Sequence, residues 1–400
     1  MRRILLVVAI AATCALAPPV LAQEPATACM VPAPGAGSPA PTAQQADYRA
    51  RLHALATGRG VRVAVIDTGV ARHDQLARLE SGPDLVAPDS PDPHLDCDIH
   101  GTVVAGVIAA RDTGIAPSAT ILSIRQSSAH YRSDARDAEA RGAGDLESLA
   151  RAITAAVDAD ADVINVSVVS CVAPAIAAKL NTRPLDDALR LAEDSGALIV
   201  AAAGNTGGSG SGCSPGDVVY PAHGPTVLSV AAVEEPRDHA DYSLPGRLAA
   251  PGTVPLGLSP TGGWARGDAA SPLALAADEV QPLTGTSFAA PVIAGTAALL
   301  RERFPDATPA QLRERLHATA HPGSGFVDPL AAVSATTFSQ SRVVRPAFVA
   351  HPAQRDAEPA RRLAWLAGSL AFLALAIACA AALRPRRIRE EDCFNARHVT

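Results

Sequence analysis

Three polar residues whose types can carry out acyl-transfer chemistry occur in the order Asp, His, Ser. Asp67 ends the apolar run "VAVID", His100 opens the small-residue segment "HGTVVAG", and Ser287 lies in "GTSFAAP". A serine hydroxyl is a weak nucleophile at neutral pH and needs a base within hydrogen-bond reach. That base in turn needs a third group to orient it and to stabilise its positive charge. The three residues therefore predict a nucleophile, a general base and an orienting carboxylate.

Each of the three has a simpler interpretation when it is taken alone. Asp67 is also explained as an aspartate that binds a turn after a strand, and His100 as an ordinary core or surface histidine. Ser287 is also explained as a helix cap, because serine oxygens accept hydrogen bonds from the free N–H groups of a first turn. The order of the three residues matches one of the orders known for catalytic triads, which favours the joint interpretation.

Asn205 is a fourth candidate, because it follows an apolar run in "VAAAGNTGG". Acyl transfer builds negative charge on an oxygen, and a side-chain amide in a glycine-rich turn is able to donate a hydrogen bond to that oxygen. Asn205 is therefore predicted to contribute to an oxyanion hole.

The elements that must position these residues alternate between strand-like and helix-like patterns. Strands are predicted at "VRVAVID", "ATILSIR", "ADVINVSVV", "ALIVAAAGN" and "VLSVAAV", with helices at "HGTVVAGVIAA", from Asp145 to Val157, at "LDDALRLAEDSG" and from near Ser287 and Pro309. This alternation predicts an α/β fold with a doubly wound, mostly parallel sheet and helices on both faces. Sites in such folds form beyond the carboxyl ends of strands.

The composition indicates an aliphatic core and does not favour nucleic acid as a partner. Of 400 residues, 48% are hydrophobic but only 3% aromatic, and the net charge is −6. Basic residues form no stripe outside the two ends of the chain, so no nucleic-acid binding is predicted.

The two ends predict export and a membrane anchor. Residues 1–22 have two arginines, an apolar run and a small-residue cleavage pattern, which predict a signal peptide; an uncleaved anchor is the alternative, but the run is short for a membrane span. Residues 363–383 carry no charge and predict a transmembrane helix. The arginine-rich tail, residues 384–400, is then cytoplasmic. We therefore expect a single-pass protein of the cell membrane whose main domain is extracytoplasmic.

Between these ends we predict three parts. Residues 23–45 are rich in proline and are expected to be extended and irregular. Residues 46–340 form the main domain, and residues 341–362 form a linker.

Four cysteines lie in the predicted extracytoplasmic part: Cys29, Cys97, Cys171 and Cys213. An even number in an oxidising compartment suggests two disulfides, with three possible connectivities. Metal ligation is the alternative, but the chain has no C-x-x-C pair, and no carboxylate cluster has the spacing of a calcium loop. No metal and no cofactor is predicted.

The remaining polar residues near the candidates receive simpler interpretations. Asp96 and Asp98 flank Cys97 and could bias the pKa of His100, but a solvated loop is the preferred interpretation. Five scattered histidines are interpreted as surface or loop residues: His73, His94, His130, His223 and His239.

The four motifs "VAVIDTGV", "HGTVVAG", "AAAGN" and "GTSFAAP" together resemble the subtilisin-like serine proteases, from about Val61 to Val333. The resemblance implies that Asp67, His100 and Ser287 form a catalytic triad, and that Asn205 and the Ser287 N–H form the oxyanion hole. It also implies a peptide or protein substrate, whose backbone is bound along Ser167, Val168, Val169, Ala203 and Gly204.

The chain is still more similar to the mycosins, the membrane-anchored subtilisin-like proteases of type VII secretion systems. "LDCDIHGT", "SIRQSS", "VINVSVVSC" and the C-terminal span with its basic tail carry this resemblance. It implies pairing of Cys29 with Cys97 and of Cys171 with Cys213, and a type VII secretion membrane complex as partner.

Two departures from ordinary subtilisins shape the functional hypothesis. The segment before Asp67 is too short for the usual folding propeptide, so the extension is expected to stay attached. Val169 stands where many subtilisins have glycine, and its side chain should narrow the cleft. We therefore expect an endopeptidase of restricted specificity that acts on exported proteins; the alternative is a scaffold for a secretion complex in which proteolysis is secondary.

Overall fold

The computed structural model describes residues 25–335, apart from residues 36, 38, 133–141, 208–211 and 237. The predicted signal peptide, linker, membrane span and cytoplasmic tail lie outside the described residues. Among the residues that are described, no helix is both long enough and apolar enough to cross a membrane.

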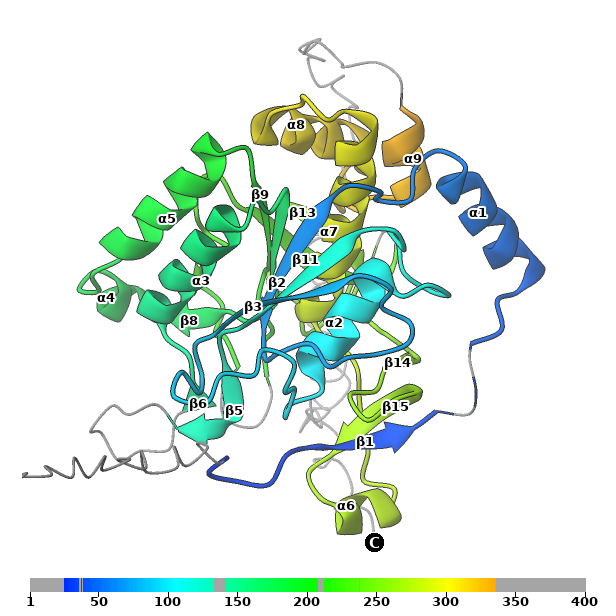
Figure 1. The fold of residues 1–400 in the computed structure, drawn as a ribbon. Helices are drawn as coiled ribbons and strands as arrows, with labels where there is room; N and C mark the ends of the chain where they lie inside the picture. The colour runs from blue at the N-terminus through cyan, green and yellow to red at the C-terminus, as the bar shows by residue number, and fades with distance from the viewer. Residues whose placement is uncertain are drawn as a thin grey trace, which may run out of the picture. The chain divides into compact units, whose positions relative to one another are not determined.

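Eight strands of the described part form a mostly parallel central sheet (Figure 1). The strand order is β12, β11, β9, β7, β2, β4, β3, with β13 also paired to β11, and each pair is parallel except that of β11 with β12. The predicted class of α/β fold is confirmed. The strands are β2 Arg62–Asp67, β3 Leu79–Asp84, β4 Thr120–Arg125, β7 Val163–Val166, β9 Leu198–Ala202, β11 Leu228–Glu235, β12 Asp238–His239 and β13 Leu248–Pro251.

Smaller sheets and nine helices of the described part surround the central sheet. The shorter strands are β1 Val31–Pro34, β14 Gly257–Leu258, β15 Trp264–Ala269 and β16 Gln281–Pro282 in one sheet, β8 Ser170–Val172 with β10 Val218–Tyr220, and β5 Ser128–Arg132 with β6 Gly142–Ala143. The helices are α1 Ala43–His53, α2 His100–Ala109, α3 Leu146–Asp158, α4 Pro174–Ala177, α5 Arg183–Asp194, α6 Pro272–Ala276, α7 Thr286–Arg303, α8 Pro309–Thr319 and α9 Pro329–Ser334.

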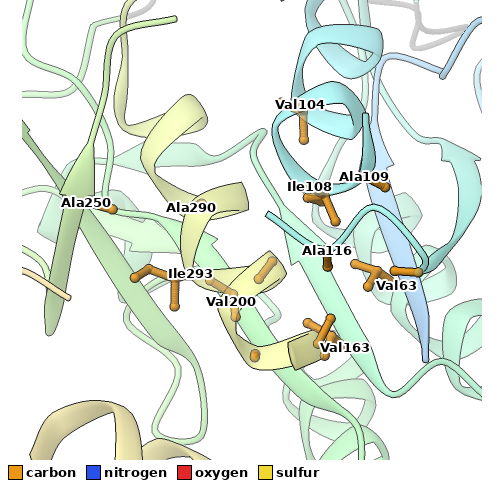
Figure 2. Close-up of a cluster of buried hydrophobic side chains, with 14 of the residues drawn as sticks. Val63, Val104, Ile108, Ala109, Ala116, Val163, Val200, Ala250, Ala290 and Ile293 are labelled. Atoms are coloured by element: carbon orange, nitrogen blue, oxygen red, sulfur yellow. The ribbon is translucent and has the colours of Figure 1, made fainter. Parts of the chain in front are cut away.

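Helices cover both faces of the central sheet because successive residues of a strand point to opposite faces. In β2, Val63 and Val65 pack in the cluster that includes α2 and α7, whereas Ala64 and Ile66 pack in the cluster that includes α3 and α5. Figure 2 shows part of the first cluster, with side chains from α2, α7 and strands β2, β7, β9 and β13: Val104, Ile108, Ala290, Ile293, Val63, Val163, Val200 and Ala250. Small and aliphatic side chains thus build the core, as the composition predicts.

The N-terminal extension is more regular than the sequence predicts. Residues 31–34 form β1, which pairs antiparallel with β15, and α1 begins at Ala43 inside the segment expected to be irregular. The residues "VPAP" are not typical of a strand because proline has no N–H to donate, but an edge strand tolerates proline. A capping box between Thr42 and Gln45 starts α1, so the boundary drawn at residue 45 falls within a helix.

Candidate active site

Asp67 and His100 are in direct contact at the carboxyl edge of the sheet. Asp67 is the last residue of β2 and is fully buried, whereas His100 opens α2 and keeps 25% of its side chain exposed. His100 Nδ1 lies 2.7 Å from Asp67 Oδ1, and the same oxygen accepts a hydrogen bond from the Thr68 N–H at 2.8 Å. When Nδ1 donates to Asp67, Nε2 of the neutral ring is the acceptor that a general base requires.

The first turn of α2 lies very close to the loop after Asp67. A Cβ on residue 101 would lie 2.1 Å from the Gly69 carbonyl oxygen, so only glycine fits at Gly101. Ile99, just before the helix, has a φ of 69°, which is an outlier for a β-branched residue. Such a conformation costs about 1–3 kcal/mol and persists only where its surroundings hold it. The backbone that brings His100 into contact with Asp67 is therefore strained at Ile99, the residue before the histidine.

The electrostatics of the pair favour a protonated imidazole. Burial lowers the pKa of His100, but the charge of Asp67 and its hydrogen bond, together with the charges of Asp96 and Asp98, outweigh burial and raise the pKa of His100 to about 9. This environment stabilises the imidazolium that forms when a base takes a proton from a nucleophile.

Ser287 lies in the first turn of α7 and exchanges two hydrogen bonds with Ser167. The Ser287 hydroxyl donates to the Ser167 carbonyl at 2.9 Å, and the Ser167 hydroxyl donates to the Ser287 carbonyl at 2.8 Å. Pro291 explains why this carbonyl is available, because proline has no N–H to donate four residues back. Among the hydrogen bonds of the described residues, none joins Ser287 to His100. The neighbouring Phe288 packs against His100 with ring centroids 5.2 Å apart, so the first turn of α7 lies beside the imidazole.

Asn205 follows β9 and is oriented by the start of α7. Its Oδ1 accepts hydrogen bonds from the Thr286 N–H at 2.9 Å and from the Thr286 hydroxyl at 3.0 Å, which leaves Nδ2 as a donor. A Cβ on Gly285 would lie 3.1 Å from Asn205 Nδ2 and 3.7 Å from Ser287 N. Both nitrogens therefore border the space that this glycine leaves open. Since Ser287 N–H is in a first turn, it has no carbonyl partner within the helix, and the two donors are able to stabilise an oxyanion.

A cleft of 590 Å³ brings most of the predicted site residues together. Those that line it are His100, Asn205, Ser287, Ser167, Val168 and Val169. Ala203 and Gly204 do not line it, because both are buried directly before Asn205. The Gly204 N–H donates to the Thr286 hydroxyl at 3.1 Å, so this residue supports the start of α7 rather than the wall of the cleft.

Both disulfides implied by the resemblance are present and lie near the cleft. Cys171 and Cys213 are bonded to each other and line it. Cys29 is bonded to Cys97, three residues before His100. Cys29 thereby attaches the extension covalently to the domain.

The extension also binds β5, whose residues Ser128 and Ala129 line the cleft. The Ala26 N–H donates to the His130 carbonyl at 2.8 Å, and the Thr27 hydroxyl lies 3.0 Å from His130 Nδ1. None of the extension residues that the structure describes lines the cleft. The extension therefore contacts a strand of the cleft wall without lining the cleft.

Two interpretations of nearby polar residues are wrong. His130 is not a surface or loop histidine, because it lies in β5, is 9% exposed and contacts Thr27 of the extension. Asp96 is not in a solvated loop: it is 7% exposed and accepts hydrogen bonds from Thr68 and Thr102. Burial raises the pKa of its carboxyl to about 6. Neither environment is visible in the sequence because both depend on distant segments.

The family described as "Subtilase family" matches residues 58–349. The chain belongs to the subtilase family. It is 39% identical over 386 residues to Mycosin-4 of Mycobacterium tuberculosis (strain ATCC 25618 / H37Rv), a match that covers 87% of this chain and 82% of that protein. The similarity to mycosins is therefore confirmed, and this subtilase is a serine endopeptidase.

Two solved structures show the same relationship for the subtilase. The MycP3 protease from the type VII (ESX-3) secretion system is 34% identical with a TM-score of 0.68, and the match covers 80% of this chain and 97% of that one. A chain of an intact ESX-5 inner membrane complex is 30% identical with a TM-score of 0.67, and the match covers 89% of this chain and 94% of that one.

Two features of the site in this subtilase go beyond the sequence-based predictions. Ser167 was predicted only as a substrate contact, but its hydroxyl also binds the Ser287 carbonyl. Pro291 was the signal that could have revealed it, because a proline inside a helix leaves one carbonyl without its usual donor. Thr68 was not predicted at all; its N–H binds the carboxylate that contacts His100.

Proposed function

We propose that this subtilase is a membrane-anchored serine endopeptidase of restricted specificity that acts on exported proteins together with a type VII secretion complex. Ser287 is the nucleophile and His100 the general base and later the general acid. Asp67 orients His100, and Asn205 binds the oxyanion with the Ser287 N–H. The observation that carries this proposal is the 2.7 Å contact between His100 and Asp67 beside a cleft that Ser287 and Asn205 also line.

The geometry supports a two-step acyl transfer. A bound substrate carbonyl takes the space bordered by Asn205 Nδ2 and Ser287 N, and the Ser287 hydroxyl turns from the Ser167 carbonyl toward His100. His100 Nε2 accepts the hydroxyl proton as Ser287 attacks the carbonyl carbon, and then gives that proton to the leaving amine. Water repeats the sequence on the acyl-enzyme.

Restricted specificity rests on Val169. This residue lines the cleft and also packs against both hydrophobic clusters, so its side chain is held in place and limits the substrate. We expect slow hydrolysis of casein by the wild-type protein and faster hydrolysis by Val169→Gly. Rapid, unselective hydrolysis by the wild type would contradict this part of the proposal.

The membrane anchor and the partner rest on the sequence and on the relatives. Residues 1–22 and 363–383 have the patterns of a signal peptide and a membrane span, which place the protease domain on the extracytoplasmic side. The structural relatives include chains from ESX-3 and ESX-5 systems, one of them within an inner membrane complex. Membrane fractionation, and copurification with a type VII complex, test these two points.

The catalytic roles are tested by labelling the purified full-length protein with a fluorophosphonate probe. We expect modification at Ser287 and none in Ser287→Ala. A folded wild-type protein that is not labelled would refute the proposed triad.

A scaffold role is the second candidate, favoured by the similarity to a chain within an inner membrane complex. Secretion that survives Ser287→Ala but fails when the whole protein is deleted would establish it. Secretion that fails equally in both strains would establish proteolysis as the essential activity.

A further inference from the structure

Asp96 is a buried carboxylate whose hydrogen bonds reach both sides of the candidate catalytic pair. Its Oδ1 accepts from the Thr68 hydroxyl at 2.8 Å, and its Oδ2 accepts from the Thr102 N–H at 2.8 Å and from the Thr102 hydroxyl at 2.6 Å. Thr68 directly follows Asp67, and Thr102 lies two residues after His100. One side chain therefore connects the end of β2 to the first turn of α2.

The same contacts replace the missing cap of α2. Ile99 occupies the N-cap position and makes no side-chain hydrogen bond to the helix, so the first N–H groups of α2 need other acceptors. Asp96 Oδ2 accepts from the Thr102 N–H, and the Thr68 hydroxyl accepts from the Gly101 N–H at 3.0 Å. A carboxylate is also favoured at this end of a helix by the helix dipole.

The Thr68 hydroxyl has one proton and two carboxylates within reach. Its oxygen lies 2.8 Å from Asp96 Oδ1 but 3.3 Å from Asp67 Oδ1. The shorter contact directs the proton to Asp96, which turns the lone pairs of the oxygen toward the Gly101 N–H. Asp96 thereby determines how Thr68 binds α2.

The strained residue between Asp96 and His100 is held by the same carboxylate. Asp96 accepts from the Asp98 N–H at 3.3 Å before Ile99 and from the Thr102 N–H after it. An isoleucine in the left-handed region persists only when the surrounding structure holds it there. The two hydrogen bonds to Asp96 hold the backbone on both sides of Ile99.

We infer that Asp96 is a positioning residue for the Asp67–His100 pair, holding the first turn of α2 against the end of β2 so that the imidazole stays in contact with its carboxylate. This inference rests on the proposed roles of Asp67 and His100. Asp96 does not line the cleft and makes no hydrogen bond to His100. It acts through its hydrogen bonds to Thr68 and Thr102.

The test compares fluorophosphonate labelling of the full-length wild-type protein and Asp96→Asn, with kinact and KI separated from the dependence on probe concentration. We expect kinact to fall roughly 10–100-fold, as for a misplaced catalytic group, and KI to stay unchanged. A folded Asp96→Asn protein with wild-type kinact would overturn the inference. A wild-type protein that is not labelled would instead refute the proposed triad, so the two failures are distinguishable.

The pH profile separates positioning from a purely structural role. The charged groups near His100 are Asp67 of β2, Asp96 and Asp98 of the preceding loop, and Asp268 of β15. Loss of the Asp96 charge should lower the pKa of His100 and move the rise of kinact with pH to lower pH. Asp84→Asn is the matched control, because Asp84 is an equally buried carboxylate that binds Arg125. The control should lose stability and keep the wild-type profile; a profile unmoved in Asp96→Asn would overturn the inference.

Thr68 gives a second route if Asp96→Asn does not fold. Thr68→Val removes the hydroxyl that joins Asp96 to α2, whereas Thr68→Ser keeps it. We expect a lower kinact in Thr68→Val and recovery in Thr68→Ser. Equal rates in the two variants would show that the link through Thr68 does not position the pair.

Discussion

Asn205 has two roles that two substitutions should separate: its Oδ1 binds the start of α7, and its Nδ2 is the proposed donor to the oxyanion. Asn205 Oδ1 accepts from the buried Thr286, while Nδ2 borders the space beside Ser287 N. Asn205→Asp keeps an oxygen toward Thr286 but removes the donor, so the labelling rate at Ser287 should fall by about 10²–10³, or about 2.7–4 kcal/mol. Asn205→Ala should lose this rate as well, and should also lower the free energy of unfolding by about 1–3 kcal/mol because the Thr286 N–H loses its acceptor.

The assay measures the fluorophosphonate labelling rate at Ser287 and the denaturant unfolding curve of each variant. Thr286→Val is the control for the labelling rate: it removes the hydroxyl, which binds Asn205 and the Gly204 N–H, and keeps the hydrogen bond from the Thr286 N–H to Asn205 Oδ1. Wild-type labelling of a folded Asn205→Asp protein would refute the oxyanion role. Equal stability of the Asp and Ala variants would refute the capping role.

Three further outcomes are expected. The labelling rate should rise with pH as His100 loses its proton. Because Asp67 raises the pKa of His100, Asp67→Asn should move this rise to lower pH and reduce the maximal labelling rate by about 10⁴. A rise at the wild-type pH would show that Asp67 does not raise the pKa of His100. Gly101→Ala should destabilise the protein by about 1–3 kcal/mol and slow labelling, because the alanine Cβ would meet the Gly69 carbonyl oxygen. A Gly101→Ala protein with the melting temperature of the wild type would show that α2 moves to accommodate the added methyl group. Replacing both Cys29 and Cys97 by serine should lower the unfolding free energy by about 2–4 kcal/mol without speeding labelling, and faster labelling would mean that the extension obstructs the cleft.

Much of the site is predictable from the sequence because its residues stand where one local pattern changes to another. Asp67 ends an apolar run that becomes β2, His100 starts the small-residue helix α2, and Ser287 lies in the first turn of α7, which a glycine precedes. Periods of two and of about 3.6 residues are properties of neighbouring positions, so the chain alone carries them. The parallel sheet follows from the same alternation.

The prediction for the extension failed for a different reason. Whether "VPAP" forms a strand depends on an available edge, which β15 provides more than 200 residues later in the chain. The disulfide from Cys29 keeps the segment near that edge. Proline content describes only what a segment does by itself.

The sequence by itself determined the fold class, the residue types of the candidate site and their order. Only the tertiary structure decided that Asp96 is buried, that Ser167 and Ser287 exchange hydrogen bonds, and which of the predicted substrate residues face the cleft. Ser167 and Ser287 are 120 positions apart. Residue type and spacing are local, whereas burial and hydrogen-bond partners are set by segments that meet only when the chain has folded.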